Sequence, residues 1–122
     1  MATASNTKRI GVPKTYKMFI GGKFPRSESG RTFELNDAKG NFLANVSLAS
    51  RKDARDAVQA ARKAQPGWAK ATAYNRGQVL YRIAEMLDGR AAQFAEEIAA
   101  VEGVGLEEAR AQVAAAVDSW VW

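Results

Sequence analysis

The stretch that decides the fold is residues 50–68, "SRKDARDAVQAARKAQPGW". Ser50 followed by Asp53 is a variant of the capping box, in which the serine hydroxyl accepts a hydrogen bond from the third helical amide. Small apolar side chains then recur at the spacing of one helical face, at Ala54, Ala57, Val58 and Ala61. The stretch therefore predicts a helix that permits close packing. We expect Pro66 and Gly67 to end it and Trp68 to fold back against it.

Helical patterns continue from this stretch to the C-terminal end of the sequence. Thr72 is the expected N-cap of a second helix, which the Asp88-Gly89 pair breaks or kinks. Its apolar stripe consists of Val79, Leu80, Ile83, Ala84 and Leu87. A third pattern, Phe94, Ile98 and Val101, ends near Gly103. The sequence therefore predicts two further helices before residue 105.

The final pattern has no stop signal. Its apolar positions are Leu106, Ala109, Val113, Ala116, Val117 and Trp120. Glu107 and Glu108 suit a first turn, but no Lys, Arg or Gly closes the segment before Trp122. We expect the helix to be interrupted rather than terminated, and we expect Trp68 and Trp120 to pack in a core.

Strand signals precede Ser50. Two short apolar runs, residues 16–20 and 23–26, are joined by Gly21-Gly22, which is typical of a tight hairpin. Residues 31–35 and 41–49 alternate apolar and polar side chains around a turn at 36–40, which predicts a second hairpin. The predicted fold is therefore α+β, with two N-terminal β-hairpins followed by three to four packed helices.

Composition excludes several kinds of chemistry. The chain has 122 residues and contains no cysteine and no histidine, which removes disulfides, thiol nucleophiles and imidazole bases. Its net charge of +5 originates in residues 1–27, which hold six Lys or Arg and no acid. The simplest interpretation is a solvated, disordered basic arm over residues 1–15, and nucleic-acid binding is the less favoured alternative. No apolar run is long enough to cross a membrane.

No group of residues has the pattern of an active site. Glu96-Glu97 and Glu107-Glu108 are adjacent pairs, whose members point to different sides of a helix. Other candidates, Ser27, Ser29, Ser119, Asp88 and Asp118, have no His or Cys to complete a catalytic or metal-binding set. We therefore expect no catalytic, cofactor-binding or metal-binding residue in this chain.

Three segments resemble the NAD(P)-dependent aldehyde dehydrogenase superfamily. "MFIGGKFPRSESGRTFE" (18–34) is similar to its N-terminal strands. The more specific match is 49–103, with the helix Asp53 to Arg62, then Trp68, then the helix Arg76 to Leu87. "EEARAQVAAAVDSWVW" (107–122) resembles the helix that precedes the nucleotide-binding sheet. The resemblance covers residues 15–122 and identifies the chain as similar to the family's N-terminal portion.

The resemblance implies a mechanism whose groups lie elsewhere. Family members oxidise an aldehyde to a carboxylic acid with NAD or NADP, using a cysteine thiolate and a glutamate-activated water. For this chain the resemblance implies hairpin strands near the oligomer interface (16–49) and a helical packing region of the cofactor domain (50–122). It also implies a cytoplasmic homo- or hetero-oligomer and, as partner, the remainder of a dehydrogenase chain or a full-length subunit.

Three functional hypotheses stay open at this point. The chain is the N-terminal part of an aldehyde dehydrogenase-like protein and is non-catalytic by itself. Alternatively, it is a shortened, non-catalytic relative that serves as a structural partner of an active dehydrogenase. The third possibility is a basic-armed module that binds nucleic acid, which predicts binding that weakens with salt.

Overall fold

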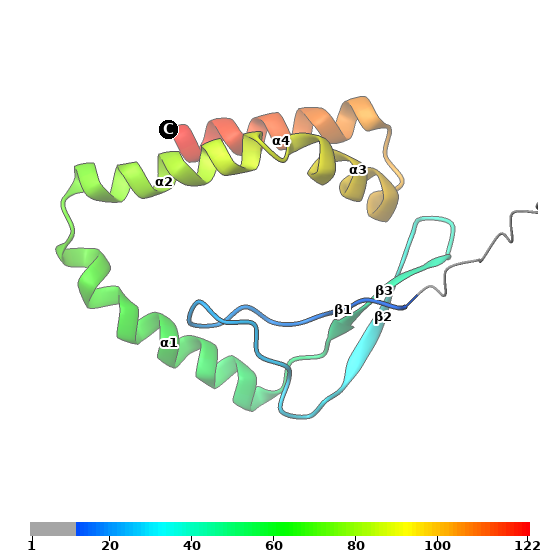
Figure 1. Cartoon of the computed structure of the whole chain (residues 1–122), viewed down its shortest axis with the longest axis horizontal. Helices are drawn as coiled ribbons and strands as arrows, with labels where there is room; N and C mark the ends of the chain where they lie inside the picture. The colour runs from blue at the N-terminus through cyan, green and yellow to red at the C-terminus, as the bar shows by residue number, and fades with distance from the viewer. Residues whose placement is uncertain (1–11) are drawn as a thin grey trace, which may run out of the picture.

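A computed structural model describes residues 12–122, so most of the expected basic arm, residues 1–15, lies outside the described residues. The elements, in order, are β1 (Thr15–Tyr16), β2 (Thr32–Asn36), β3 (Phe42–Ser47), α1 (Arg51–Lys70), α2 (Ala73–Asp88), α3 (Ala91–Glu102) and α4 (Leu106–Val121). They trace an open arch, with the strands and α1 on one side and α2, α3 and α4 on the other (Figure 1). The predicted α+β class, with hairpins before helices, is confirmed.

The strands form one small sheet in the order β1-β3-β2. β2 and β3 are the predicted antiparallel hairpin, with Leu35 opposite Ala44. A register shift between Leu35 and Asn36 interrupts the predicted alternation at Phe42, and the side chain of Phe42 is 44% exposed. β1 pairs in parallel with β3, a long-range pairing that the local pattern does not predict.

The first hairpin is confirmed at its turn and is shorter than expected. Gly21 and Gly22 have φ values of 60° and 77°, the backbone conformation that a tight two-residue turn requires. Ile20 and Lys23 exchange backbone hydrogen bonds of 3.0 and 3.1 Å across it. Beyond Met18 and Pro25 the pairing stops, because proline has no N–H to donate to a ladder.

The expected end of the first helix is wrong. α1 continues through Pro66 and Gly67 to Lys70, and Trp68 lies within it rather than folding back. Proline has no N–H, so it removes one hydrogen bond to the carbonyl four residues earlier. That carbonyl belongs to Arg62, and residues 61–70 are all exposed, so water can donate to it instead. The helix therefore tolerates a residue that would break it in a buried setting.

The other helix boundaries follow the predicted signals. The Thr72 hydroxyl accepts from the Asn75 amide at 3.1 Å and caps α2, and Gly89 is the C-cap of the same helix. α3 ends at Gly103, which adopts the left-handed conformation with a φ of 71°. α4 packs on both α2 and α3. The core of this side of the arch consists of Ala95, Ala109 and Val113, with Leu87, Ala91, Ile98, Ala99, Val104 and Val117 around them.

The core contains no large buried side chain among the described residues. The buried apolar residues there are Ala44, Ala84, Ala95, Ala109 and Val113. Trp68 and Trp120 remain 45% and 42% exposed, so the expectation that they pack in a core is wrong for this chain as it stands. A chain of this length normally buries larger side chains. The apolar surface is therefore present but mostly uncovered.

Candidate functional site

The most ordered polar feature surrounds Asp53 at the N-terminus of α1. The Ser50 amide donates to Asp53 Oδ2 at 2.8 Å, and the Asp53 amide donates to Ser50 Oγ at 3.2 Å. These reciprocal bonds are the capping box that the sequence predicts. A carboxylate in the first turn also interacts favourably with the helix dipole.

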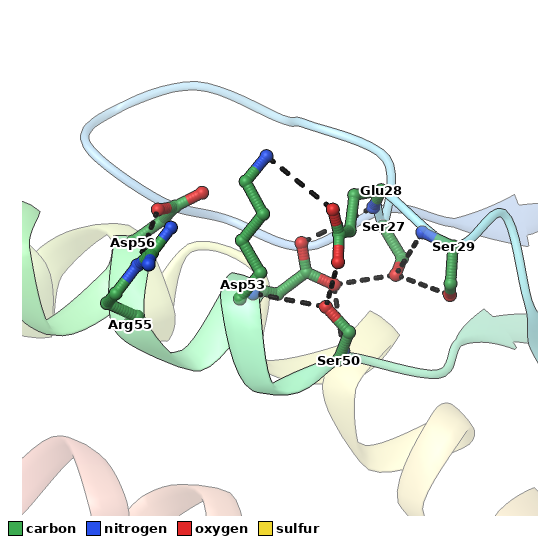
Figure 2. Close-up of polar contacts among 8 residues, drawn as sticks. Ser27, Glu28, Ser29, Ser50, Asp53, Arg55 and Asp56 are labelled. Carbon is green, nitrogen blue, oxygen red and sulfur yellow. Dashed lines mark hydrogen bonds and ion pairs between the residues drawn. The ribbon is translucent and has the colours of Figure 1, made fainter.

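The same carboxylate holds a segment that lies far away in the sequence. Ser27 Oγ donates to Asp53 Oδ2 at 2.6 Å, and the Glu28 amide donates to Asp53 Oδ1 at 3.3 Å. The Ser50 hydroxyl donates to Glu28 Oε1 at 3.1 Å, and the Ser29 hydroxyl lies 3.0 Å from Ser27 Oγ. Figure 2 shows these side chains converging on Asp53 from the turn before β2 and from the start of α1. We call Ser27, Glu28, Ser29, Ser50 and Asp53 the Asp53 cluster.

The geometry of the Asp53 cluster supports packing rather than catalysis. Ser27 and Asp53 are 7% and 5% exposed. The Ser27 hydroxyl, followed by the backbone amide of Ser50, lowers the pKa of Asp53 from 3.8 to about 2. A carboxylate with so low a pKa is a weak base and cannot usefully accept the proton of a serine nucleophile. The cluster therefore fixes the turn before β2 onto α1.

The sequence predicts the Ser50–Asp53 part of this cluster but not the bond between Asp53 and Ser27. The spacing of Ser50 and Asp53 is a local signal, and it predicts the capping box correctly. The structure places Ser27 in a turn, since the Gly30 amide donates to the Ser27 carbonyl at 3.0 Å. Its bond to Asp53 spans 26 residues and has no local sequence signature.

The other candidate acids and hydroxyls do not come together. Ser119 Oγ donates to the Ala115 carbonyl at 2.9 Å within α4, and Glu107 pairs with Arg110 on the same helix. Among residues 12–122, no group of three or more His, Cys, Asp or Glu side chains is arranged to hold a metal ion. No helix in this part of the chain is both long and apolar enough to cross a membrane.

Two apolar grooves are the larger surface features. The first, which we call the helix groove, has a volume of about 350 Å³ and lies between the end of α2, the start of α3 and the end of α4. It is lined by Ile83, Met86, Leu87, Arg90, Phe94 and Trp120. Phe94 and Trp120 are 39% and 42% exposed there. Apolar surface of this kind is typical of a face that packs against another protein segment.

The second groove, the sheet groove, lies between the sheet and α3 and has a volume of about 470 Å³. Its lining is Tyr16, Leu35, Leu43, Ala44, Val46, Glu97, Ala100 and Val101. The turn between β2 and β3 closes one side, where the Ala38 amide donates to the Ala100 carbonyl at 3.4 Å. Both grooves therefore lie where secondary structure elements meet without filling the space between them.

A third apolar surface lies along α1 and is only partly covered. The tip of the first hairpin lies over its alanines, with Phe19, Ile20 and Gly21 beside Ala57, Ala60, Ala61 and Ala64. Close packing was expected along Ala54, Ala57, Val58 and Ala61, and of these Ala57 and Ala61 lie against the hairpin turn. Val58 and Trp68 on the same helix stay 58% and 45% exposed.

Sequence comparisons give the family to which these features belong. A sequence model of the aldehyde dehydrogenase family matches residues 24–122. The cytosolic 10-formyltetrahydrofolate dehydrogenase of Pongo abelii is 36% identical over 104 residues, which cover 83% of this chain and 11% of that protein. The 2-hydroxymuconic semialdehyde dehydrogenase of Pseudomonas sp. (strain CF600) is 44% identical over 85 residues, or 68% of this chain and 18% of that protein.

Solved structures agree. An NAD-dependent aldehyde dehydrogenase from Sinorhizobium meliloti matches 99% of this chain and 25% of its own, with a TM-score of 0.84 and 26% identity. HpcC from Thermus thermophilus matches 90% of this chain and 21% of its own, with a TM-score of 0.84 and 32% identity. The chain therefore spans about a quarter or less of the length of these relatives. It belongs to the aldehyde dehydrogenase family and corresponds to the N-terminal portion of such a protein.

Proposed function

We propose that this chain is the N-terminal packing segment of an NAD(P)-dependent aldehyde dehydrogenase and is non-catalytic by itself. In the complete protein, residues 50–122 pack on the cofactor domain and the strands within 16–49 lie near the oligomer interface. The complete protein is a cytoplasmic oligomer that oxidises an aldehyde to a carboxylic acid. One relative, the Pongo abelii protein, is named as cytosolic, which supports the location.

One observation carries this proposal. The backbone of this chain superposes on full dehydrogenases, but several of its large apolar side chains are not buried. Four helices and three strands match full dehydrogenases with TM-scores near 0.84. Yet Trp68, Phe94 and Trp120 are between 39% and 45% exposed. Fully burying an exposed aromatic side chain contributes about 2 to 3 kcal/mol, so the exposed part of each of these three forgoes about 1 kcal/mol, a sizeable sum for a small domain. A further protein segment that covers the helix groove and the sheet groove would supply the missing burial free energy.

The chemistry itself belongs to residues outside this segment. The sequence contains no cysteine, so it cannot supply the thiolate that the family's mechanism needs. NAD or NADP binding is proposed for the complete protein, since one structural relative is named NAD-dependent and another was solved in complex with NAP. The role of the present residues is to hold the cofactor domain in shape.

The test is the intact mass of the polypeptide in its native source, followed by an activity assay. We expect a mass well above the 13.2 kDa of these residues, and NAD(P)-dependent aldehyde oxidation by that polypeptide. We expect no activity from the 122 residues expressed alone. Deleting residues 50–68 from the longer polypeptide should abolish activity, with loss of folded protein in a thermal melt.

Other outcomes would contradict the proposal. A native mass of 13.2 kDa overturns it, and co-purification with a full-length dehydrogenase would then identify a structural partner instead. A monomeric isolated chain that melts cooperatively also contradicts it, because uncovered grooves should not support an independent domain.

A further inference from the structure

A polar pocket opens beside the Asp53 cluster and shares Ser27 with it. Its volume is about 290 Å³, and it lies where β1, the turn before β2 and the end of β3 meet. The lining is Thr15, Lys17, Arg26, Ser27, Gly30, Arg31, Thr32 and Ser47. It therefore contains three cationic side chains and four hydroxyls, and no carboxylate.

The three cations lack ion-pair partners within the described residues. The ion pairs found there involve Lys52, Arg55, Arg82 and Arg110, each with a carboxylate within 4.0 Å. Lys17, Arg26 and Arg31 are absent from that set. Three like charges around one small space repel one another, and an anion between them removes that repulsion.

Three acids lie in a neighbouring depression rather than in the lining of the pocket. Arg26 also borders a neighbouring depression that includes Glu28, Asp53 and Asp56. Glu28 is 3.6 Å from Lys52, and Arg55 is 3.9 Å from Asp56. Asp53 accepts hydrogen bonds from Ser27 and from the amides of Ser50 and Glu28. Glu28 and Asp56 are therefore paired with other cations, whereas Asp53 stays ionised beside Ser27 and offsets part of the positive charge of the three lining cations.

The walls of the pocket are held in place by hydrogen bonds. Ser47 Oγ donates to the Tyr16 carbonyl at 2.8 Å, and the Leu48 amide donates to the Arg31 carbonyl at 2.9 Å. Thr32 lies opposite Ser47 in the β2–β3 ladder. Ser27 is fixed by Asp53 at 2.6 Å. A ligand therefore meets a fixed backbone and has to order only the exposed side chains of Lys17, Arg26 and Arg31.

We propose that this anion pocket binds a small phosphate-bearing molecule. Arginine binds phosphate oxygens in a bidentate manner, and a pair of arginines with a lysine matches the charge of a phosphoryl or diphosphoryl group. The side chains of Thr15 and Thr32 line the pocket and offer additional donors. A volume of about 290 Å³ suits a small anion rather than the continuous backbone of a nucleic acid, which needs an extended groove.

The test uses inorganic pyrophosphate as the probe, titrated calorimetrically into the intact protein at physiological salt. Arg31→Gln and the double variant Arg26→Gln/Arg31→Gln remove the cations but keep the side-chain stem. Each lost charge-assisted contact should raise the dissociation constant by roughly tenfold or more. Arg31→Lys, which keeps the charge but not the fork, should lie between the wild type and Arg31→Gln.

Arg62→Gln is the matched control, because Arg62 is an exposed arginine of α1 that lies outside the pocket. It should bind pyrophosphate like the wild type. An equal loss in Arg62→Gln, or the absence of binding at about 1 mM pyrophosphate, overturns the proposal. Tighter binding of a single-stranded oligonucleotide that is equally weakened by Arg62→Gln also overturns it, because diffuse charge would then explain the result. The titration contains no aldehyde or dinucleotide, so its outcome is independent of dehydrogenase activity.

Discussion

At the scale of single residues, the low pKa of Asp53 depends on a partner distant in sequence. The Ser27 hydroxyl is the largest cause of the shift. Ser27→Ala should therefore raise the pKa of Asp53 from about 2 towards 3.8, as followed by NMR titration of the side-chain carboxyl carbon. The pKa of Asp37 is lowered by the Asn41 amide instead and should not change. An unchanged Asp53 pKa would show that Ser27 does not bond it in solution.

Gly103 is a glycine at which the structure leaves no room for a β-carbon. Its φ is 71°, and a β-carbon built there lies 2.5 Å from the β-carbon of Ala38. Gly103→Ala should destabilise the intact protein by about 1 to 2 kcal/mol from backbone strain, and by more if the β2–β3 turn cannot move. Gly105→Ala is the control, because Gly105 has a φ of −65° and open space around it. Equal effects in urea unfolding would refute the steric argument.

At the scale of elements, the stability of α1 should depend on pH through its cap. The pKa of Asp53 is depressed in the folded state, from 3.8 to about 2, so its contribution is fully present above 3.8 and is lost as pH falls through 2. Hydrogen exchange of residues 51–56, corrected for the intrinsic rate, should therefore accelerate in that window. Asp53→Asn should lose this part of the pH dependence. If the Asp53→Asn variant keeps the whole pH dependence, other carboxylates cause that dependence.

The other half of the same cap can be tested at neutral pH. The Ser50 hydroxyl accepts from the Asp53 amide at 3.2 Å, so Ser50→Ala should cost about 1 kcal/mol of stability in the intact protein. Ser119→Ala removes an exposed hydroxyl within α4 and should change stability by less than about 0.5 kcal/mol. Similar losses in thermal unfolding for both variants would argue against a special role of the cap.

Pro66 is a helix-breaking residue inside α1, and its replacement should stabilise the helix, whereas Ser50→Ala should destabilise the protein. Pro66→Ala restores a helical N–H in an exposed turn and should slow amide exchange across residues 67–70 by up to about 3 kcal/mol of local stability. Gln65→Ala is the control, since position 65 already has its N–H, and should change exchange by only a few tenths of a kcal/mol. No difference between the two variants would mean that the helix ends before Pro66 in solution.

At this scale, local features of the elements could be predicted from the sequence, whereas their long-range contacts could not. Caps are local signals, so Ser50, Thr72 and Gly103 mark their helix boundaries correctly. Pro66 misleads because its effect depends on whether the freed carbonyl is exposed, and exposure is a property of the fold. The parallel pairing of β1 with β3 and the Ser27–Asp53 bond join residues about 30 positions apart, and no local pattern encodes such contacts.

At the scale of the whole molecule, the uncovered grooves should make the isolated chain bind hydrophobic dyes and self-associate. Phe94→Ser/Trp120→Ser removes the aromatic lining of the helix groove and should reduce dye fluorescence by roughly half, since the sheet groove remains. Tyr74→Ser is the matched control, because Tyr74 is 74% exposed on α2 and lines neither groove. Sedimentation should show fewer oligomers for the double variant only, and an equal effect of Tyr74→Ser would contradict the assignment.

The arrangement of α4 also has a consequence for how the chain folds as it is synthesised. Two of the three core residues, Ala109 and Val113, come from this helix, and α4 packs on both α2 and α3. α2 and α3 therefore emerge from the ribosome before the surface that buries their apolar stripes exists. The Asp53 cluster needs only the first turn of α1 beyond residue 53, so the strand region and the start of α1 can form first. During a pause in translation between α3 and α4, the apolar faces of α2 and α3 would stay exposed and could bind chaperones.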